Sequence, residues 1–278
     1  MTLIDGKEVS KIIKAEVKKQ ITDMMISPKL LVILVGDDPA SKVYVSSKEK
    51  ASKLCGINAE TLVLDKDISE EELISIIKKA NEDESVNAIL VQLPLPKHID
   101  SSKIVNAIDP LKDVDGLSLL NQGKLMAGER GIVPCTPKGV IKLLKYYNIN
   151  LDGAKALVIG RSILVGKPVG MLLLNENASV TYAHSHTKDL KEACLNSDVI
   201  VVAIGKAKAL KEDMVKEGAV IIDVGINRTD DGLVGDVDFE NVKDKASFIT
   251  PVPGGVGPMT IACLMENVLE CYLMQKGK

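Results

Sequence analysis

The sequence predicts an α/β protein built from two α/β domains. Short apolar stretches alternate with amphipathic stretches of helical length, a pattern typical of parallel strands joined by helices. A proline- and glycine-rich middle, residues 109–139, interrupts this alternation, which then restarts. We therefore predict a boundary near 117–136, a first domain over about 1–120 and a second over about 137–250. A strand–glycine–helix stretch at 156–170 marks the second domain as a candidate nucleotide-binding unit.

The first half is expected to contain three strands. An amphipathic helix should cover about 5–25, because its apolar residues recur at helical spacing along one stripe. Ser69 and Glu72 form a capping box, which predicts that a helix begins there. The strands are expected at 30–36, 61–64 and 87–92, and a further helix at about 40–54.

The second half repeats the alternation with five apolar stretches. A last helix, from about 259 to 276, follows the segment Pro251–Pro258 and is expected to pack back onto the first domain. The glycines of that segment suit either a tight interdomain turn or a close approach of backbone to a ligand. The five strands are expected near 156–159, 179–182, 198–204, 219–224 and 247–250.

Composition narrows the function classes. The 278 residues are 46% hydrophobic but only 3% aromatic, without tryptophan, so the core must be aliphatic. A net charge of −3 does not indicate a basic surface of the kind that binds nucleic acid or a membrane. No apolar run reaches the ~18 residues of a membrane span, and the N-terminus resembles no signal peptide. We expect a cytoplasmic protein that binds neither nucleic acid nor membrane.

The cysteines and histidines give no metal-binding pattern. The five cysteines are odd in number and form no C-x-x-C pair, and there are only three histidines. We therefore expect reduced, packed thiols and no metal site.

The stretch 156–170 has the features of a phosphate-binding turn. Ala156–Ile159 is expected to be a buried strand that stops at Gly160, and a helical pattern begins near Lys167-Pro168. A strand followed by a glycine turn and a helix points the amides of the helix N-terminus at a phosphate. The glycines at 160, 166 and 170 depart from the G-x-G-x-x-G spacing, so an ordinary strand–turn–helix remains an alternative.

The end of the next strand favours NADP over NAD. An acidic residue there would hold the ribose 2′-hydroxyl of NAD and repel a 2′-phosphate. Residues 184–188 (His-Ser-His-Thr-Lys) carry no carboxylate, and Arg161 could bind the same phosphate. Ser185 is the favoured contact, because His184 and His186 could be ordinary surface residues.

Four polar residues of the first half are candidates for the chemistry. Tyr44 and Lys48 are four apart and share a helix face, Gln92 follows the third strand, and Asp115 lies before a glycine turn. Each has an ordinary alternative: an exposed helix face, a strand end or a turn aspartate. Because ligands of open α/β sheets bind beyond the carboxyl ends of strands, we expect the four to converge.

These motifs together resemble the bifunctional methylenetetrahydrofolate dehydrogenase/methenyltetrahydrofolate cyclohydrolase family over nearly the whole chain. Six segments carry the resemblance in the family's order, and the last of them is long and specific. They are Tyr44-Val-Ser-Ser-Lys48, Val91-Gln-Leu-Pro-Leu-Pro96, Lys112-Asp-Val-Asp-Gly116, Pro134-Cys-Thr-Pro137, Gly160-Arg-Ser-Ile-Leu-Val-Gly-Lys-Pro168 and Thr250-Pro-Val-Pro-Gly-Gly-Val-Gly-Pro-Met-Thr260.

The resemblance implies a catalytic and folate-binding set in the first domain. Lys48 would be the central catalytic group, Tyr44 would pack on the folate, Gln92 would tune Lys48 and Asp115 would hold the pterin ring. The segment containing Pro253, Gly254 and Gly255 would also contact substrate. The substrates would be one-carbon derivatives of tetrahydrofolate.

The resemblance also implies how the cofactor binds. NADP would lie in a Rossmann-like C-terminal domain, across a cleft from the first domain, and the protein would be a homodimer with a role in purine biosynthesis. The contacts would be Gly160, Arg161, Ser162, Ser185 and the backbone around Ile226.

Two departures and three alternatives remain open. His186 stands where many members carry Lys or Arg, and the segment after Gly116, Leu-Ser-Leu-Leu-Asn, differs from bacterial members. A relative retaining only one activity would fit the same motifs. A non-catalytic nucleotide sensor would be expected to lose Lys48, Gln92 or Asp115, and a shikimate-type dehydrogenase would not explain 250–260.

Overall fold

The computed structural model describes residues 1–230 and 232–277. Their packing divides the chain into two compact units. Unit 1 combines Met1–Ser10 with Thr136–Thr260, and unit 2 combines Lys11–Cys135 with the described residues from Ile261 onward. The sequence-based limits assign residues 1–10 to the first domain, whereas β1 (Thr2–Leu3) pairs with β11 (Phe248–Ile249) inside unit 1.

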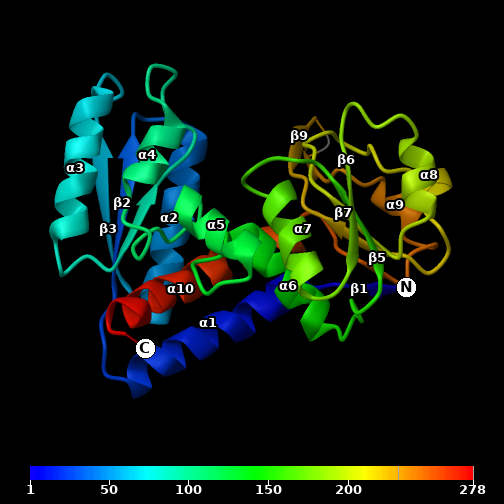
Figure 1. Cartoon of the computed structure of the whole chain (residues 1–278), viewed down its shortest axis with the longest axis horizontal. Coiled ribbons are helices and arrows are strands. Elements are labelled where there is room, and N and C mark those ends of the chain that lie inside the picture. The colour runs from blue at the N-terminus through cyan, green and yellow to red at the C-terminus, as the bar shows by residue number, and fades with distance from the viewer. Residues whose placement is uncertain (231, 278) are drawn as a thin grey trace. The chain divides into compact units, whose positions relative to one another are not determined.

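Unit 2 contains a parallel three-stranded sheet in the order β3-β2-β4. The central strand, β2 (Lys29–Val35), is buried along nearly its whole length and leads through Gly36 into α2 (Pro39–Cys55). Figure 1 shows α3 (Glu70–Glu82) beside β2 (Lys29–Val35) and β3 (Asn58–Leu64). The remaining elements are β4 (Ala88–Val91), α4 (Ser101–Ala107), α5 (Leu119–Ala127) and most of α1 (Gly6–Asp23) and α10 (Val256–Gln275).

Local sequence signals set the ends of the helices in unit 2. Asp38 caps α2 by accepting a hydrogen bond from the amide of Ser41, and Gly56 ends it in a left-handed conformation. Ser69 and Glu72 form the predicted capping box of α3, with both reciprocal hydrogen bonds present. The first of these caps places the helix that carries Tyr44 and Lys48 directly after the end of β2.

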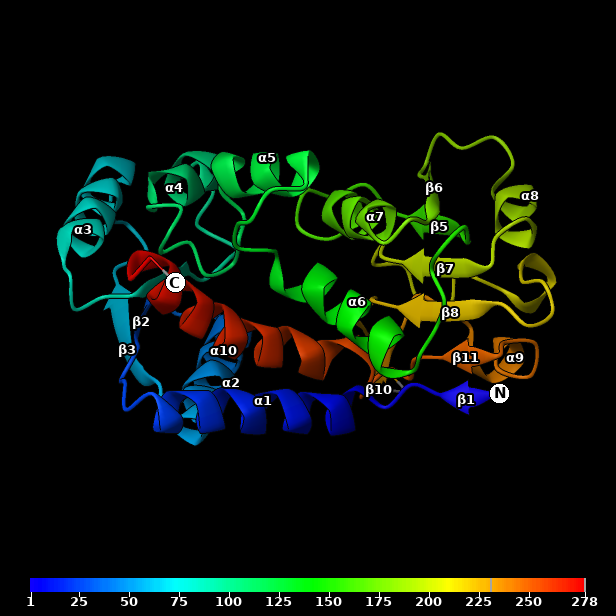
Figure 2. The same cartoon turned by 60° about the horizontal axis from the view of Figure 1, so that its bottom comes forward.

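Unit 1 contains a six-stranded parallel sheet in the order β1-β11-β8-β7-β5-β6. Figure 2 shows β7, β8 and β11 side by side, pointing the same way. The central strands are fully buried, which explains their continuous Val/Ile sequences. The other elements are α6 (Cys135–Tyr146), β5 (Lys155–Ile159), α7 (Gly166–Asn175), β6 (Ser179–Ala183), α8 (Leu190–Leu195), β7 (Val199–Val202), a 3₁₀ turn (Glu212–Met214), β8 (Val220–Asp223), β9 (Asn227–Thr229), β10 (Gly232–Val234) and α9 (Phe239–Val242).

The predicted α/β class is confirmed, and the expected strands are all present. β3 begins at Asn58, earlier than the predicted Thr61, because an edge strand keeps polar residues such as Glu60 that weaken the apolar pattern. The strand β1 and the β9–β10 hairpin are absent from the prediction, since both are too short to show a periodicity. Among the described residues, no helix is both long and apolar enough to span a membrane.

Candidate functional site

Lys48 and Gln92 are joined by a hydrogen bond in unit 2. The Nζ atom of Lys48 donates to Oε1 of Gln92 at 2.9 Å, across the carboxyl ends of β2 and β4. The amide Nε2 of Gln92 in turn donates to the carbonyl of Leu93 at 2.6 Å, so the amide oxygen faces the lysine. Gln92 is almost fully buried, Lys48 is half-buried and Tyr44, one turn earlier on α2, is exposed.

Asp115 lies close enough to Lys48 for an electrostatic interaction between the two side chains. Burial raises the pKa of the Asp115 carboxyl, the positive charge of Lys48 lowers it, and the neighbouring Asp113 raises it further. The Sγ atom of Cys135 is 3.8 Å from Oδ1 of Asp115 and donates to that carboxylate. The predicted convergence of Lys48, Gln92 and Asp115 is therefore present in the geometry of unit 2.

The loop that carries Asp115 is anchored by residues that the sequence analysis missed. Nζ of Lys112 is buried and donates to the carbonyls of Ala80, Asn81 and Asp83 at the end of α3. Burial lowers the pKa of this lysine.

Two further polar side chains hold the same loop. Asp113 accepts hydrogen bonds from the Ser118 amide at 2.7 Å and from Nδ2 of Asn121 at 3.1 Å. Asn267 donates to the carbonyl of Val114 at 2.9 Å. A polar residue such as Asn267 inside the apolar helix α10 is the sequence signal that could have found this role.

Gly160 forms the turn at the end of β5 in unit 1. Its φ is +127°, a conformation that side-chain-bearing residues rarely adopt, and a Cβ there would overlap the carbonyl of Ala203. Its amide donates to the carbonyl of Ala183, which brings the turn beside the end of β6. Ser162 then accepts hydrogen bonds from the amides of Val165 and Gly166, where α7 begins.

The loop after β6 carries Ser185, two residues beyond the Ala183 carbonyl that the Gly160 amide binds. The amide of His186 donates to Nδ1 of His184 at 3.2 Å, and the amide of His184 donates to Oγ1 of Thr187 at 2.9 Å. The exposed Arg161 follows Gly160 directly. The amides at the start of α7 and the carboxylate-free 184–188 loop fit a phosphorylated ribose, because nothing in that loop repels an anion.

A cavity of about 160 Å³ in unit 1 joins two sets of predicted residues. Ile226 lines it from the end of β8, and Pro253, Gly254 and Gly255 line it from the segment before α10. The lining is mostly apolar, which suits the flat face of a ring. The structure thus brings Ile226 and 253–255 together, although Ile226 was predicted to contact the cofactor and 253–255 to contact the substrate.

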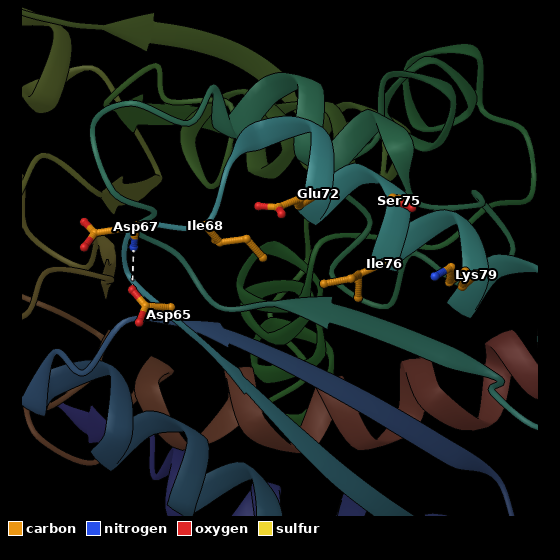
Figure 3. A pocket seen from close by; sticks show the side chains of 7 residues that line it. All are labelled: Asp65, Asp67, Ile68, Glu72, Ser75, Ile76 and Lys79. Carbon is orange, nitrogen blue, oxygen red and sulfur yellow. Dashed lines mark hydrogen bonds between the residues drawn. The ribbon is translucent and has the colours of Figure 1, made fainter.

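A groove along α3 in unit 2 contains none of the predicted site residues. It measures about 560 Å³ and is lined by Asp65, Asp67 and Glu72 together with two isoleucines and Lys79 (Figure 3). The Asp67 amide donates to Oδ1 of Asp65 at 2.9 Å, so this acidic lining is partly satisfied by the loop itself. Three carboxylates disfavour a phosphate or a folate tail there. Within the described residues, no cluster of His, Cys, Asp or Glu has the geometry of a metal site.

Fold and site together define an α/β enzyme class with a dinucleotide-type turn in one unit and a lysine–amide–carboxylate cluster in the other. Residues 4–115 match the family model for the tetrahydrofolate dehydrogenase/cyclohydrolase catalytic domain, and residues 134–276 match the model for its NAD(P)-binding domain. The chain therefore belongs to the tetrahydrofolate dehydrogenase/cyclohydrolase family.

Individual relatives are similar over nearly their whole length. The bifunctional protein FolD of Oceanobacillus iheyensis is 53% identical over 97% of this chain and 96% of its own. The crystal structure of the bifunctional FolD dehydrogenase/cyclohydrolase from Campylobacter jejuni superposes with a TM-score of 0.97, at 50% identity over 99% of both chains. The Trypanosoma brucei enzyme, solved with NADP cofactor and an inhibitor, has a TM-score of 0.94 at 36% identity, over 100% of this chain and 99% of its own.

Replacing Gly160 with alanine tests the role of the turn. The new methyl group would overlap the Ala203 carbonyl, so we expect a loss of about 2 to 4 kcal/mol in the unfolding free energy of unit 1, together with weaker NADP binding. Gly153→Ala is the matched control. Its φ is also positive but its surroundings are open, so it should cost only about 1 kcal/mol and spare NADP binding. Urea unfolding and NADP titration measure both, and equal losses in the two variants would rule out the close approach as the cause.

Proposed function

We propose that this protein oxidises 5,10-methylenetetrahydrofolate to 5,10-methenyltetrahydrofolate with NADP and hydrolyses the product to 10-formyltetrahydrofolate. The observation that carries the proposal is the Lys48–Gln92 hydrogen bond beside Asp115, since the hydrolytic step needs a positioned acid–base group at the folate. Matches to both family domains favour the bifunctional enzyme over a relative that retains one activity.

Lys48 is proposed to transfer protons in the cyclohydrolase step. The methenyl product of the oxidation is a cation, so a permanent positive charge beside it would be unfavourable. The addition of water to this cation and the opening of the ring both require protons to move. An amine that alternates between its charged and neutral forms can meet both requirements.

Gln92 is proposed to hold Lys48 in place through these changes. Its amide oxygen is an acceptor only, and both ammonium and amine carry an N–H to donate to it. The 2.6 Å bond to the Leu93 carbonyl prevents the amide from turning round. The lysine nitrogen is therefore held at one position while it gains or loses a proton.

Asp115 and Tyr44 are proposed to bind the folate. A carboxylate accepts hydrogen bonds from adjacent N–H groups such as those on a pterin edge, and the anchored loop 112–116 fixes its position. Tyr44 exposes its ring one helical turn from Lys48, where it can stack on a flat heterocycle. Pro253, Gly254 and Gly255 are proposed to contact substrate through their backbone.

The cofactor is proposed to be held by the loops of unit 1. NADP supplies the position on the nicotinamide that accepts the hydride. Gly160, Arg161, Ser162, Ser185 and the backbone at Ile226 would hold it, with Arg161 neutralising the 2′-phosphate. A cleft between the two domains stays a prediction of the family resemblance.

The cellular setting is also part of the proposal. The family resemblance supports a cytoplasmic homodimer that supplies formyl groups for purine biosynthesis. Light scattering on the purified protein would contradict the homodimer if it gave the mass of a single chain.

Turnover of methylenetetrahydrofolate with each dinucleotide in parallel tests the proposal. We expect NADP to support faster oxidation than NAD, because the 184–188 loop offers no carboxylate to repel the 2′-phosphate. Absorbance of the reduced nicotinamide and decay of the methenyl product follow the two activities separately. Oxidation without methenyl hydrolysis would instead identify a single-activity dehydrogenase.

Lys48→Met should reduce cyclohydrolase activity by roughly 100- to 10,000-fold, the typical contribution of a positioned acid–base group. Methenyltetrahydrofolate decay measures it directly. Lys50→Met, which removes an exposed lysine from the same helix, is the control and should retain activity. Hydrolysis at the wild-type rate in a folded Lys48→Met variant would eliminate Lys48 as the acid–base group.

Asp115→Ala should weaken folate binding by roughly 30-fold, the loss expected for hydrogen bonds to a charged acceptor. NADP binding should stay within about twofold, because the loops proposed to hold NADP belong to unit 1. Calorimetric titration of each ligand separates the two effects. Equal losses for folate and NADP would contradict a direct role for Asp115 at the pterin.

A further inference from the structure

Two buried aspartates in unit 1 hold the loops at the carboxyl edge of its sheet. Asp236 is completely buried, and Asp223, the last residue of β8, is only 3% exposed. Within residues 1–230 and 232–277, neither carboxylate is paired with an Arg or Lys side chain. Both are surrounded by backbone amides instead. Burying a carboxylate destabilises the folded protein unless such donors form hydrogen bonds with it. We therefore ask what the two buried aspartates do for the loops around them.

Asp236 fixes the loop that follows β7. Its Oδ2 atom accepts hydrogen bonds from the amides of Ile204 at 2.7 Å and Gly205 at 2.9 Å. Its Oδ1 atom accepts from the amide of Lys206 at 2.8 Å and from Nδ2 of Asn227 at 2.9 Å. Three consecutive amides of one loop therefore converge on a single side chain.

The loop held by Asp236 packs against the Gly160 turn. The amide of Ala203 donates to the carbonyl of Ile159 at 2.8 Å. The carbonyl of Ala203 occupies the space that a side chain at position 160 would need. A shift of residues 203–206 would therefore disturb the turn proposed to receive the dinucleotide.

Asp223 fixes the neighbouring loop, which carries Ile226. Its Oδ1 atom accepts hydrogen bonds from the amides of Gly225 and Asp236, both at 2.9 Å, and its Oδ2 atom accepts from the amide of Val237 at 2.9 Å. Asp223 also lines the 160 Å³ cavity beside Ile226.

The two carboxylates form one network. The amide of Asp236 is bound by the side chain of Asp223, and a Cβ at Gly225 would overlap the carboxyl group of Asp236. Burial raises the pKa of Asp223 to about 6, although the amides of Val237, Asp236 and Gly225 lower it. The three backbone amides that donate to Asp223 favour its ionised carboxylate.

We propose that Asp223 and Asp236 are positioning residues for the dinucleotide. Asp236 holds the loop 203–206 against the Gly160 turn, and Asp223 holds the loop 224–226 beside the 160 Å³ cavity, in the shape that binds it. The inference rests on the proposed NADP-dependent function. Neither aspartate touches the cofactor in this scheme. Each aspartate acts through backbone that contacts the cofactor, or through backbone that supports the contacting residues.

The test is Asp236→Asn in the full-length protein. The amide has nearly the same shape but replaces one acceptor oxygen with an NH₂ group that faces further N–H donors. We expect the dissociation constant for NADP to rise by about tenfold or more, and the KM for NADP to rise with little change in kcat at saturation. Binding of a folate analogue should stay within about twofold.

Asp198→Asn is the matched control in the same unit. Asp198 precedes β7 at the opposite edge of the sheet, where its carboxylate accepts from the Lys155 amide at 2.7 Å and pairs with Lys216. This variant should lose stability but bind NADP like the wild type. Thermal unfolding of all variants separates a general loss of stability from a loss of binding.

Several outcomes would overturn the proposal. One is NADP binding at wild-type affinity in a folded Asp236→Asn variant, and another is an equal loss of affinity in Asp198→Asn. Asp223→Asn provides a second variant if the first does not fold. If neither folds, hydrogen exchange of the wild type decides, since the amides of 204–206 and 225 should gain protection when NADP binds. A wild-type protein that binds no NADP would refute the proposed function instead.

Discussion

The loops at the strand ends of this protein depend on buried polar side chains that bind backbone. Its core is almost entirely aliphatic, so the chain leaving each strand has little aromatic surface to pack against. Unsatisfied amides and carbonyls would be costly at that depth. Lys112 binds three carbonyls at the end of α3, and Asp236 binds three amides after β7. Both units thus use one charged side chain to fix a loop that carries or supports candidate site residues.

The fold could be predicted from the sequence wherever burial is continuous. The strands β2, β5, β7 and β8 are buried along their lengths, and each appears as an apolar run of the right length. Elements stabilised by pairing alone could not be predicted, since β1 has two residues and the β9–β10 hairpin is largely exposed. β1 also depends on a partner far away in sequence, β11, which local periodicity does not report.

The candidate site could be predicted where a side chain is itself proposed to do chemistry, and not where it supports another. Lys48 lies on the helix that follows β2, Gln92 follows β4 and Asp115 precedes a glycine turn, and the structure places the three together. Asp113 and Asn267 hold backbone groups in the same neighbourhood. Nothing in the local sequence distinguishes Asp113 from an ordinary turn aspartate, and the polar Asn267 in the apolar helix α10 indicates that its side chain needs a partner without showing which one. The distinction requires knowing which backbone groups they meet.

The same dependence explains why the glycines of unit 1 are placed where they are. A loop that wraps closely around a buried carboxylate has no room for side chains facing it, and Gly225 faces Asp236 while Gly235 faces Asp223. Gly160 likewise has no room for a side chain, because a Cβ there would overlap the carbonyl of Ala203, next to the residues that Asp236 holds. Gly166 and Gly170 are constrained by other neighbours, because a Cβ at 166 would overlap the Gly160 carbonyl and one at 170 would overlap the Tyr182 hydroxyl. The spacing of 160, 166 and 170 therefore follows from close packing inside the protein, which a fingerprint based on phosphate contact alone does not describe.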